Sequence, residues 1–285
     1  MRGVNLLISR SLPEFWIDRL TRERGAWSRL VYLVDDDIVA GAQSAHLPRR
    51  YTERLERVAS KQQPDLLDLA DTVVVTSHAL ADRYAETHSD VRLLEPVLTT
   101  PLPGVHHFKA KMWRLGFHGT RAHREDLELI SPALAYLHDG CADVMFELMV
   151  GRQTPEALQQ CERVYCPRPR PWRHFKRLLG TPHLHIGLAP LLDNAFNRGK
   201  SWIKFLDIAA MGGVGVYSNR PPYTEVVEHG FDGLLADDTP ESWYQCLQHL
   251  LYHPEDARVM AMRAQEKAHQ LGDPSRAAQF WRTLS

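Results

Sequence analysis

Short apolar runs and amphipathic segments alternate along almost the whole chain. Runs typical of buried strands occupy 4–9, 29–34 and 71–77, and helical periodicity occupies 13–24 and 78–86. Repeated strand–helix alternation is the pattern of a parallel sheet whose two faces are covered by helices. The pattern therefore predicts an α/β fold.

The same alternation restarts after an irregular segment. Residues 97–107, VLTTPLPGVHH, contain two prolines and a glycine and show no clear periodicity, as is typical of an inter-domain connection. We therefore expect two Rossmann-like domains, 1–105 and 106–285, the first of them short. In the second domain we expect strands within 113–119, 143–150, 162–166, 183–191 and 214–218, and helices over 124–137, from about Gly199 to Met211, and in three stretches from about Pro240 onward.

Composition narrows the function classes. The 34 lysines and arginines nearly balance the 35 aspartates and glutamates, so no global field would recruit nucleic acid. The apolar run at the start is interrupted by Arg10 and is too short for a signal peptide or a membrane span, so we expect a cytoplasmic protein. The four cysteines form no CxxC pair, which disfavours a structural zinc site and a disulfide framework.

Two other features have more than one interpretation. His183 and His185 would share one face of a strand, which is a conceivable metal pair, although a role in the core or beside a cleft is favoured and we expect no metal site. The segment CPRPRPWRHFKR mixes arginines with Trp172, a composition that suits RNA, a nucleotide-facing loop or a membrane surface. We assign no site to it.

The most informative stretch is 189–219, APLLDNAFNRGKSWIKFLDIAAMGGVGVYSN. We expect a helix to begin near Gly199 beyond a strand end, with Lys200 and Ser201 in its first turn. A helix start suits a phosphate, and a lysine adds a full charge. Lys200, Lys204 and Asp207 are four and three residues apart and would form one stripe. The alternative is a solvated ion pair of Lys204 with Asp207.

The run from His183 to about Ala268 resembles the donor domain of GT-B fold glycosyltransferases, particularly the group 1 (family 4) type. The matching segments are 189–219, PPYTEVVEHGFDGLLADD and ESWYQCLQHLLYHPEDARVMAMRAQEKA. RLGFHGTRAHREDLELI resembles the first strand and turn of that domain, and ADTVVVTSHALADRY resembles the last strand and helix of an acceptor domain. Together these segments cover roughly two thirds of the chain.

The resemblance implies a hexosyltransferase-like enzyme of glycan or polysaccharide biosynthesis. Asp207 would hold the donor ribose, and Lys200 and Lys204 would neutralise its diphosphate. The turn at Gly119 and Thr120 would let backbone N–H groups approach the phosphates, and Glu225 matches a segment near the donor. The donor would be a nucleoside-diphosphate sugar and the acceptor a glycan or a lipid-linked molecule, with peripheral membrane contact possible and no further cofactor required.

The chain departs from that pattern in three ways: its first domain is short, that domain lacks the glycine-rich first loop common in such enzymes, and its acidic pair is incomplete. The two glutamates eight residues apart that are usual in the family are replaced by Gly199 and Asp207. The resemblance therefore does not fix the stereochemical outcome, and a non-catalytic scaffold that binds nucleotide or a protein partner is the alternative function.

Asp35, Asp36 and Asp37 follow a predicted strand directly. Three adjacent carboxylates repel one another, so at least one needs a cation or a raised pKa. We interpret them as candidates for the general base or for orienting the acceptor hydroxyl, against helix capping or a solvated turn. A metal-binding DxD motif of the GT-A fold is disfavoured, because only about one strand and one helix precede residue 35.

Overall fold

The computed structural model describes residues 4–150, 154–168 and 171–284. Its contacts divide the chain into two compact units. Unit 1 comprises Met1–Pro96, Asp193–Ser201 and Ser275–Ser285, and unit 2 comprises Val97–Leu192 and Trp202–Pro274. Unit 1 thus takes in two late segments of the chain, while the domain boundary near residue 105 stays a prediction.

Unit 1 contains a four-stranded parallel sheet in the order β1-β2-β3-β4. Its elements are β1 (Val4–Ser9), α1 (Glu14–Arg22), β2 (Trp27–Val34), α2 (Ile38–Ala42), α3 (Arg49–Arg57), a π-helical turn (Val58–Gln62), α4 (Gln63–Leu69), β3 (Thr72–Val75), α5 (His78–Ala85), β4 (Val91–Leu93) and α8 (Ala195–Arg198). Helix α12 (Pro274–Thr283) covers part of this sheet, because Phe280, Trp281 and Leu284 pack with Val31 and Val74.

Unit 2 contains a six-stranded parallel sheet in the order β10-β9-β8-β5-β6-β7. Its main elements are β5 (Trp113–Phe117), α6 (Arg124–Gly140), β6 (Val144–Leu148), β7 (Val164–Tyr165), α7 (Trp172–Phe175), β8 (Ile186–Ala189), α9 (Ile203–Ala210), β9 (Val214–Ser218), β10 (Leu234–Ala236), α10 (Pro240–Tyr252) and α11 (Pro254–Leu271). Within this unit, β5 comes first in the chain. Strands β6 and β7 are added on one side of it, and β8, β9 and β10 are then added on the other side. This is the Rossmann strand order, whose switch point lies between β5 and β8.

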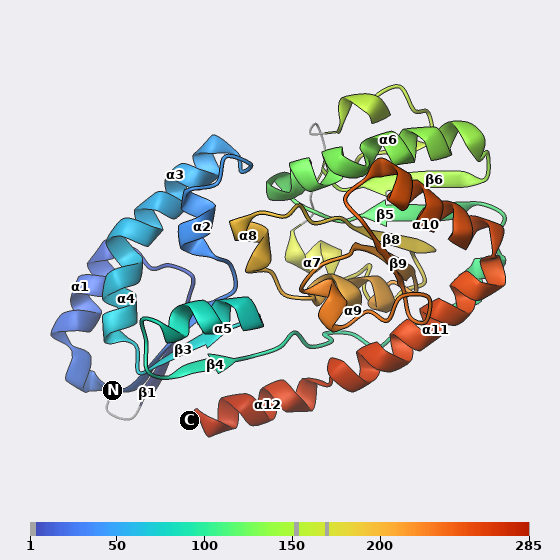
Figure 1. The fold of residues 1–285 in the computed structure, drawn as a ribbon. Helices are drawn as coiled ribbons and strands as arrows, with labels where there is room; N and C mark the ends of the chain where they lie inside the picture. The colour runs from blue at the N-terminus through green and yellow to red at the C-terminus, as the bar shows by residue number, and fades with distance from the viewer. Residues whose placement is uncertain (1–3, 151–153, 169–170, 285) are drawn as a thin grey trace. The chain divides into compact units, whose positions relative to one another are not determined.

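Helices cover both faces of the unit 2 sheet (Figure 1). Residues that alternate along the strands, such as Leu115, Phe146 and Ile186, form one core with α6 and α10. On the other face, α9 contributes Phe205 and Ile208 to a second core. The expected α/β class with two parallel sheets is therefore confirmed. No helix of the described residues is long and apolar enough to cross a membrane.

Three glycines lie side by side on the face that α9 covers. Gly116 of β5 pairs with Gly187 of β8, and Gly187 pairs with Gly215 of β9. A Cβ on Gly187 would come within 2.3 Å of the Ile208 side chain, and one on Gly116 within 2.4 Å of Leu184. The missing side chains thus make room for larger neighbours, and α9 can lie close to the strands.

The helix expected from about Gly199 to Met211 is wrong in its first part. Helix α8 ends at Arg198 and α9 begins only at Ile203, so Lys200 and Ser201 lie between two helices. The reason is local capping. The Asn194 side chain accepts a hydrogen bond from the Asn197 N–H and starts a separate short helix, a signal that periodicity alone does not show.

The glycine row gives a test of packing. Gly187→Ala should lower the free energy of unfolding by about 1–3 kcal/mol, because the new methyl group overlaps Ile208. In the double variant Gly187→Ala/Ile208→Ala, the loss of unfolding free energy should be smaller than the sum of the losses in the two single variants, as measured by urea unfolding. Gly140→Ala is the control, since its Cβ would meet nothing within 4 Å. Strictly additive losses would contradict this packing.

Candidate functional site

The candidate site of unit 2 lies at the switch point of its sheet. Strand β5 ends at Phe117, and the turn of Gly119 and Thr120 leads into α6. Ligands of open α/β sheets bind beyond the carboxyl ends of the strands at such a point. Gly119 is half-buried, and a Cβ there would come within 2.7 Å of the Phe117 ring, so the turn requires glycine. Thr120 is exposed, and its hydroxyl accepts a hydrogen bond from the Ala122 N–H.

Helix α9 places Lys204 and Asp207 beside that turn. The Lys204 ammonium donates to the main-chain oxygen of His118 at 2.7 Å and to Oδ2 of Asp207 at 3.3 Å. Asp207 is nearly buried, whereas the Lys204 side chain remains 29% exposed. The structure therefore brings Gly119, Lys204 and Asp207 together at the carboxyl end of β5, and Lys204 leaves part of its charge accessible.

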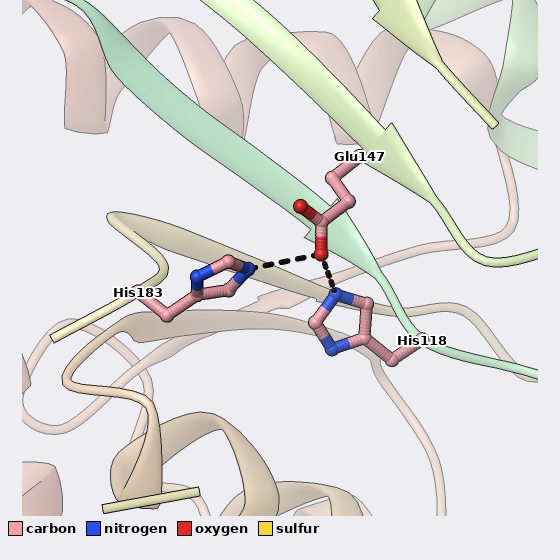
Figure 2. Close-up of side chains that lie close together, drawn as sticks. All are labelled: His118, Glu147 and His183. Atoms are coloured by element: carbon pink, nitrogen blue, oxygen red, sulfur yellow. Dashed lines mark hydrogen bonds and ion pairs between the residues drawn. The ribbon is translucent and has the colours of Figure 1, made fainter. Parts of the chain in front are cut away.

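His118, which directly precedes the turn, belongs to a mostly buried network of polar side chains with Glu147 and His183 (Figure 2). Nε2 of His118 and Nε2 of His183 both lie 2.9 Å from Oε1 of Glu147. Nη1 of Arg114 lies 2.8 Å from Nδ1 and 3.2 Å from Nε2 of the His183 ring. An ionised carboxylate can only accept hydrogen bonds, so Nε2 of His183 donates to Glu147. One carboxylate oxygen thus accepts from two imidazoles.

Burial and hydrogen bonding fix the charge states of this network. Burial acts to raise the pKa of Glu147, but the hydrogen bonds from His118 and His183 hold it well below its usual range. Burial lowers the pKa of His118, although the hydrogen bond to Glu147 acts in the opposite direction. At neutral pH the network therefore contains an ionised carboxylate and a neutral His118.

His118, Glu147 and His183 are also the described residues that could hold a metal ion. Their ligand atoms lie within 4.8 Å of one another, and two histidines with a glutamate are a ligand set that zinc uses. Arg114, however, lies against His183 and within 3.9 Å of the other Glu147 oxygen. Because Arg114 supplies the positive charge, we interpret the cluster as a hydrogen-bond network.

The other two predicted features of this region have separate surroundings. His185 stacks on Trp113 at 5.0 Å, and its Nε2 lies 2.9 Å from the His107 oxygen. His183 and His185 thus contact different partners rather than forming a pair. Of the basic segment at 166–177, Arg170 lies outside the described residues, and Trp172 begins α7.

In unit 1, each of the three aspartates after β2 has a cation. Arg10 pairs with Asp35, Lys200 donates to Asp36 at 2.6 Å, and Arg83 donates to Asp37 at 2.5 Å. Their mutual repulsion is thereby offset. Asp37 also caps α2 by accepting from the Ala40 N–H at 2.8 Å. The side chains of Asp35 and Asp36 are 35% and 11% exposed, against 6% for Asp37.

The remaining predicted residues are not gathered into one helical stripe. The expectation that Lys200, Lys204 and Asp207 share a helix face is wrong, because Lys200 precedes α9. Its ammonium lies on Asp36 and over the Phe196 ring at 4.0 Å. Ser201 is half-buried just before α9, and Glu225 is exposed at the end of a short 3-10 helix, Tyr223–Glu225.

Sequence reasoning missed the His118–Glu147–His183 network and the cations Arg10 and Arg83. One signal was present. Glu147 stands inside the apolar strand MFELMV, and a carboxylate buried in a strand requires hydrogen-bond donors. The sequence did not show which donors these were, because they come from segments 29 and 36 residues away.

Comparison with known proteins shows the fold. No family model matches the chain, and no curated protein matches its sequence. Among solved structures, sucrose-phosphate synthase from Thermosynechococcus elongatus is 15% identical with a TM-score of 0.68. The match covers 98% of this chain and 73% of that one. TarM is 9% identical with a TM-score of 0.72, over 98% of this chain and 54% of TarM.

A third match is Anabaena HepE in complex with UDP and glucose. It is 15% identical, with a TM-score of 0.66 over 98% of this chain and 77% of HepE. The chain thus spans about half the length of TarM and about three quarters of the other two. These similarities confirm the expected two-sheet α/β architecture of GT-B glycosyltransferases, with a short first sheet.

The buried histidines predict a dependence of stability on pH. Burial lowers the pKa of His185 to about 4 and also lowers those of His107 and His118. Below about pH 6.5 the unfolded chain binds protons that the folded protein does not accept, so the free energy of unfolding should fall between pH 7 and 4. Urea unfolding should show a shallower fall for His185→Phe, which keeps the ring on Trp113. Equal slopes in both proteins would contradict this assignment.

Proposed function

We propose that the protein is a glycosyltransferase that moves a hexose from a nucleoside-diphosphate sugar to an acceptor hydroxyl, in glycan or polysaccharide biosynthesis. The observation that carries the proposal is the Lys204 ammonium beside the Gly119–Thr120 turn, at the switch point of a Rossmann-ordered sheet. Glycine turns with free backbone N–H groups, together with a lysine, suit a diphosphate. The likeness to HepE, which was solved with UDP and glucose, supports a uridine diphosphate donor.

The proposed donor set follows from charge and position. Lys204 neutralises the diphosphate, and backbone N–H groups at Gly119 and Thr120 hydrogen-bond its oxygens. Asp207, which lies one helical turn after Lys204, accepts from the ribose hydroxyls. For Lys200, Ser201 and Glu225, a donor role rests on the resemblance alone. Charge on the departing diphosphate is then stabilised by the protein's own donors, so we propose that transfer requires no metal.

The aspartates of unit 1 are the proposed acceptor-side residues. Asp37 is engaged by Arg83 and by the start of α2, so its carboxylate mainly holds local structure. Asp35 is 35% exposed and keeps lone pairs that an acceptor hydroxyl can use, whereas Asp36 is buried between Lys200 and Arg10. A carboxylate in hydrogen-bond reach of that hydroxyl orients it or takes its proton.

The domain roles follow the same division. We propose that 1–105 forms the acceptor side and 106–285 the donor side. A glycan or lipid-linked acceptor, peripheral membrane contact and a cytoplasmic location stay predictions from the sequence. The segment that the sequence associates with a membrane surface exposes Trp172, and α1 likewise exposes Phe15 and Trp16 next to Arg19.

Donor binding can be measured directly. Uridine diphosphate should raise the melting temperature, because it binds only the folded protein. Lys204→Met should lower the affinity for uridine diphosphate about tenfold to hundredfold, since a charged hydrogen bond is lost. The same change should lower the affinity for uridine monophosphate less, whereas Asp207→Asn should lower both affinities by the same factor. Isothermal titration calorimetry measures these affinities.

The matched control is Lys111→Met, because Lys111 pairs with Asp143 before the first residues of β5 and β6, at the opposite end of the strands. It should bind both nucleotides like the parent protein. If the parent shows no shift with millimolar uridine, guanosine or cytidine diphosphate, the donor-site proposal fails. Binding without transfer or donor hydrolysis would instead favour a non-catalytic scaffold.

The acceptor side has its own test. Asp35→Asn or Asp36→Asn should lower the transfer rate by about 100-fold or more, as expected when a general base is lost. Nucleotide affinity should stay within about twofold of the parent value for Asp35→Asn, since neither Asp35 nor its partner Arg10 is assigned to the donor. Asp36→Asn also removes the partner of Lys200, so its nucleotide affinity does not decide the role of the cluster. Asp37→Asn should mainly lower the melting temperature. Loss of nucleotide affinity in Asp35→Asn would reassign the cluster to the donor.

A further inference from the structure

We infer that His118 is a positioning residue for the donor, because its ring is fixed by Glu147 and its main-chain oxygen holds the ammonium of Lys204. The inference rests on the proposed donor role of Lys204. It assigns a function to the buried network, which the binding set itself does not use.

Strand geometry brings the network together. Alternate residues of a strand share one face, so Arg114, Gly116 and His118 point to the same side of β5. Glu147 of β6 pairs with Gly116. The Glu147 carboxylate contacts both Arg114 and His118, which lie two residues to either side of Gly116 in the chain. His183 completes the arrangement from the segment before β8.

The ring of His118 fixes a stretch of main chain that the sheet no longer holds. Pairing between β5 and β6 ends at Phe117 and Leu148, so the His118 oxygen is the first one beyond the paired strand. It accepts from Lys204 at 2.7 Å. The hydrogen bond between the His118 ring and Glu147 restricts the rotation of this residue. It thereby fixes the direction of the main-chain oxygen to which the Lys204 ammonium donates.

Two further contacts support a role beyond folding. Phe175 of α7 lies edge-on to the His118 ring at 5.8 Å, and the Lys204 ammonium lies 5.9 Å from the same Phe175 ring. The Nδ1 atom of His118 is buried and has no hydrogen-bond partner among the described residues. An unsatisfied buried nitrogen costs stability, so stability alone does not account for a histidine here.

The test separates positioning from folding by comparing two nucleotides. His118→Phe keeps a ring but cannot donate to Glu147. This variant should bind uridine diphosphate about tenfold more weakly, because the Lys204 ammonium is no longer held toward the phosphates. Its affinity for uridine monophosphate should change by less than about threefold. His118→Gln can still donate to Glu147 and should restore diphosphate affinity to within about twofold of the parent. If His118→Phe does not fold, His118→Asn, whose side chain is too short to reach Glu147, takes its place.

A double-mutant cycle gives the second readout. Once Lys204→Met has removed the ammonium, adding His118→Phe should cause no further loss of diphosphate affinity. His185→Phe is the control, because His185 is buried nearby but contacts neither Glu147 nor Lys204 in the hydrogen bonds described. It should lower the melting temperature and leave both affinities unchanged.

The outcomes separate the proposed donor site from the positioning role of His118. If the parent binds uridine diphosphate and Lys204→Met weakens it, the donor site stands. Two results would then overturn the positioning role alone. Either His118→Phe lowers the affinity for both nucleotides equally, or its loss of diphosphate affinity adds to the loss caused by Lys204→Met. If the parent binds no nucleoside diphosphate, the proposed function and this inference fail together.

Discussion

The close approach of helix α9 to the second sheet is the constraint on which the candidate site depends. Gly116, Gly187 and Gly215 leave a strip of backbone without side chains, and Leu184, Ile208 and Tyr217 fill the space. Interiors are packed so tightly that a single methyl group matters. The strip therefore sets how far α9 lies from the strands, and with it the place of Lys204, whose ammonium reaches the end of β5. Glu147 pairs with Gly116 in the neighbouring strand, so the network lies next to the same strip. Packing and chemistry are thus set by the same residues.

Both units place cations or hydrogen-bond donors beside clustered or buried carboxylates. Glu147 receives two imidazole donors and lies near Arg114. These hydrogen bonds hold the pKa of Glu147 well below its usual range, so it stays a hydrogen-bond acceptor at neutral pH. The three aspartates after β2 each receive a cation, which offsets their mutual repulsion. In both units the partners come from segments distant in the sequence, so each carboxylate also ties separate parts of the chain together.

Local patterns predicted much of the fold and part of the site. The apolar runs located β2, β3, β5 and β9, and the three helices after Pro240 are present. The placing of the aspartates at the end of β2 and of Gly119 in a turn followed from strand boundaries alone. Periodicity did not reveal α8, whose start depends on the side-chain cap at Asn194, and it placed the start of the next helix at Gly199 rather than at Ile203. It also gave no partner for Glu147 or Lys200, since those contacts join residues far apart in sequence and depend on how the strands are ordered.

The chain enters unit 1 three times, at its beginning, at Asp193–Ser201 and again from Ser275. Phe280, Trp281 and Leu284 cover apolar residues of the first sheet, including Val31 and Val74. Multidomain chains usually fold their N-terminal domain first during synthesis. Here the segment that covers Val31 of β2 and Val74 of β3 is synthesised only after the second sheet, so this part of the first sheet is among the last to lose contact with water. A growing chain would therefore carry an exposed apolar surface throughout translation, which is the situation in which chaperones bind nascent proteins.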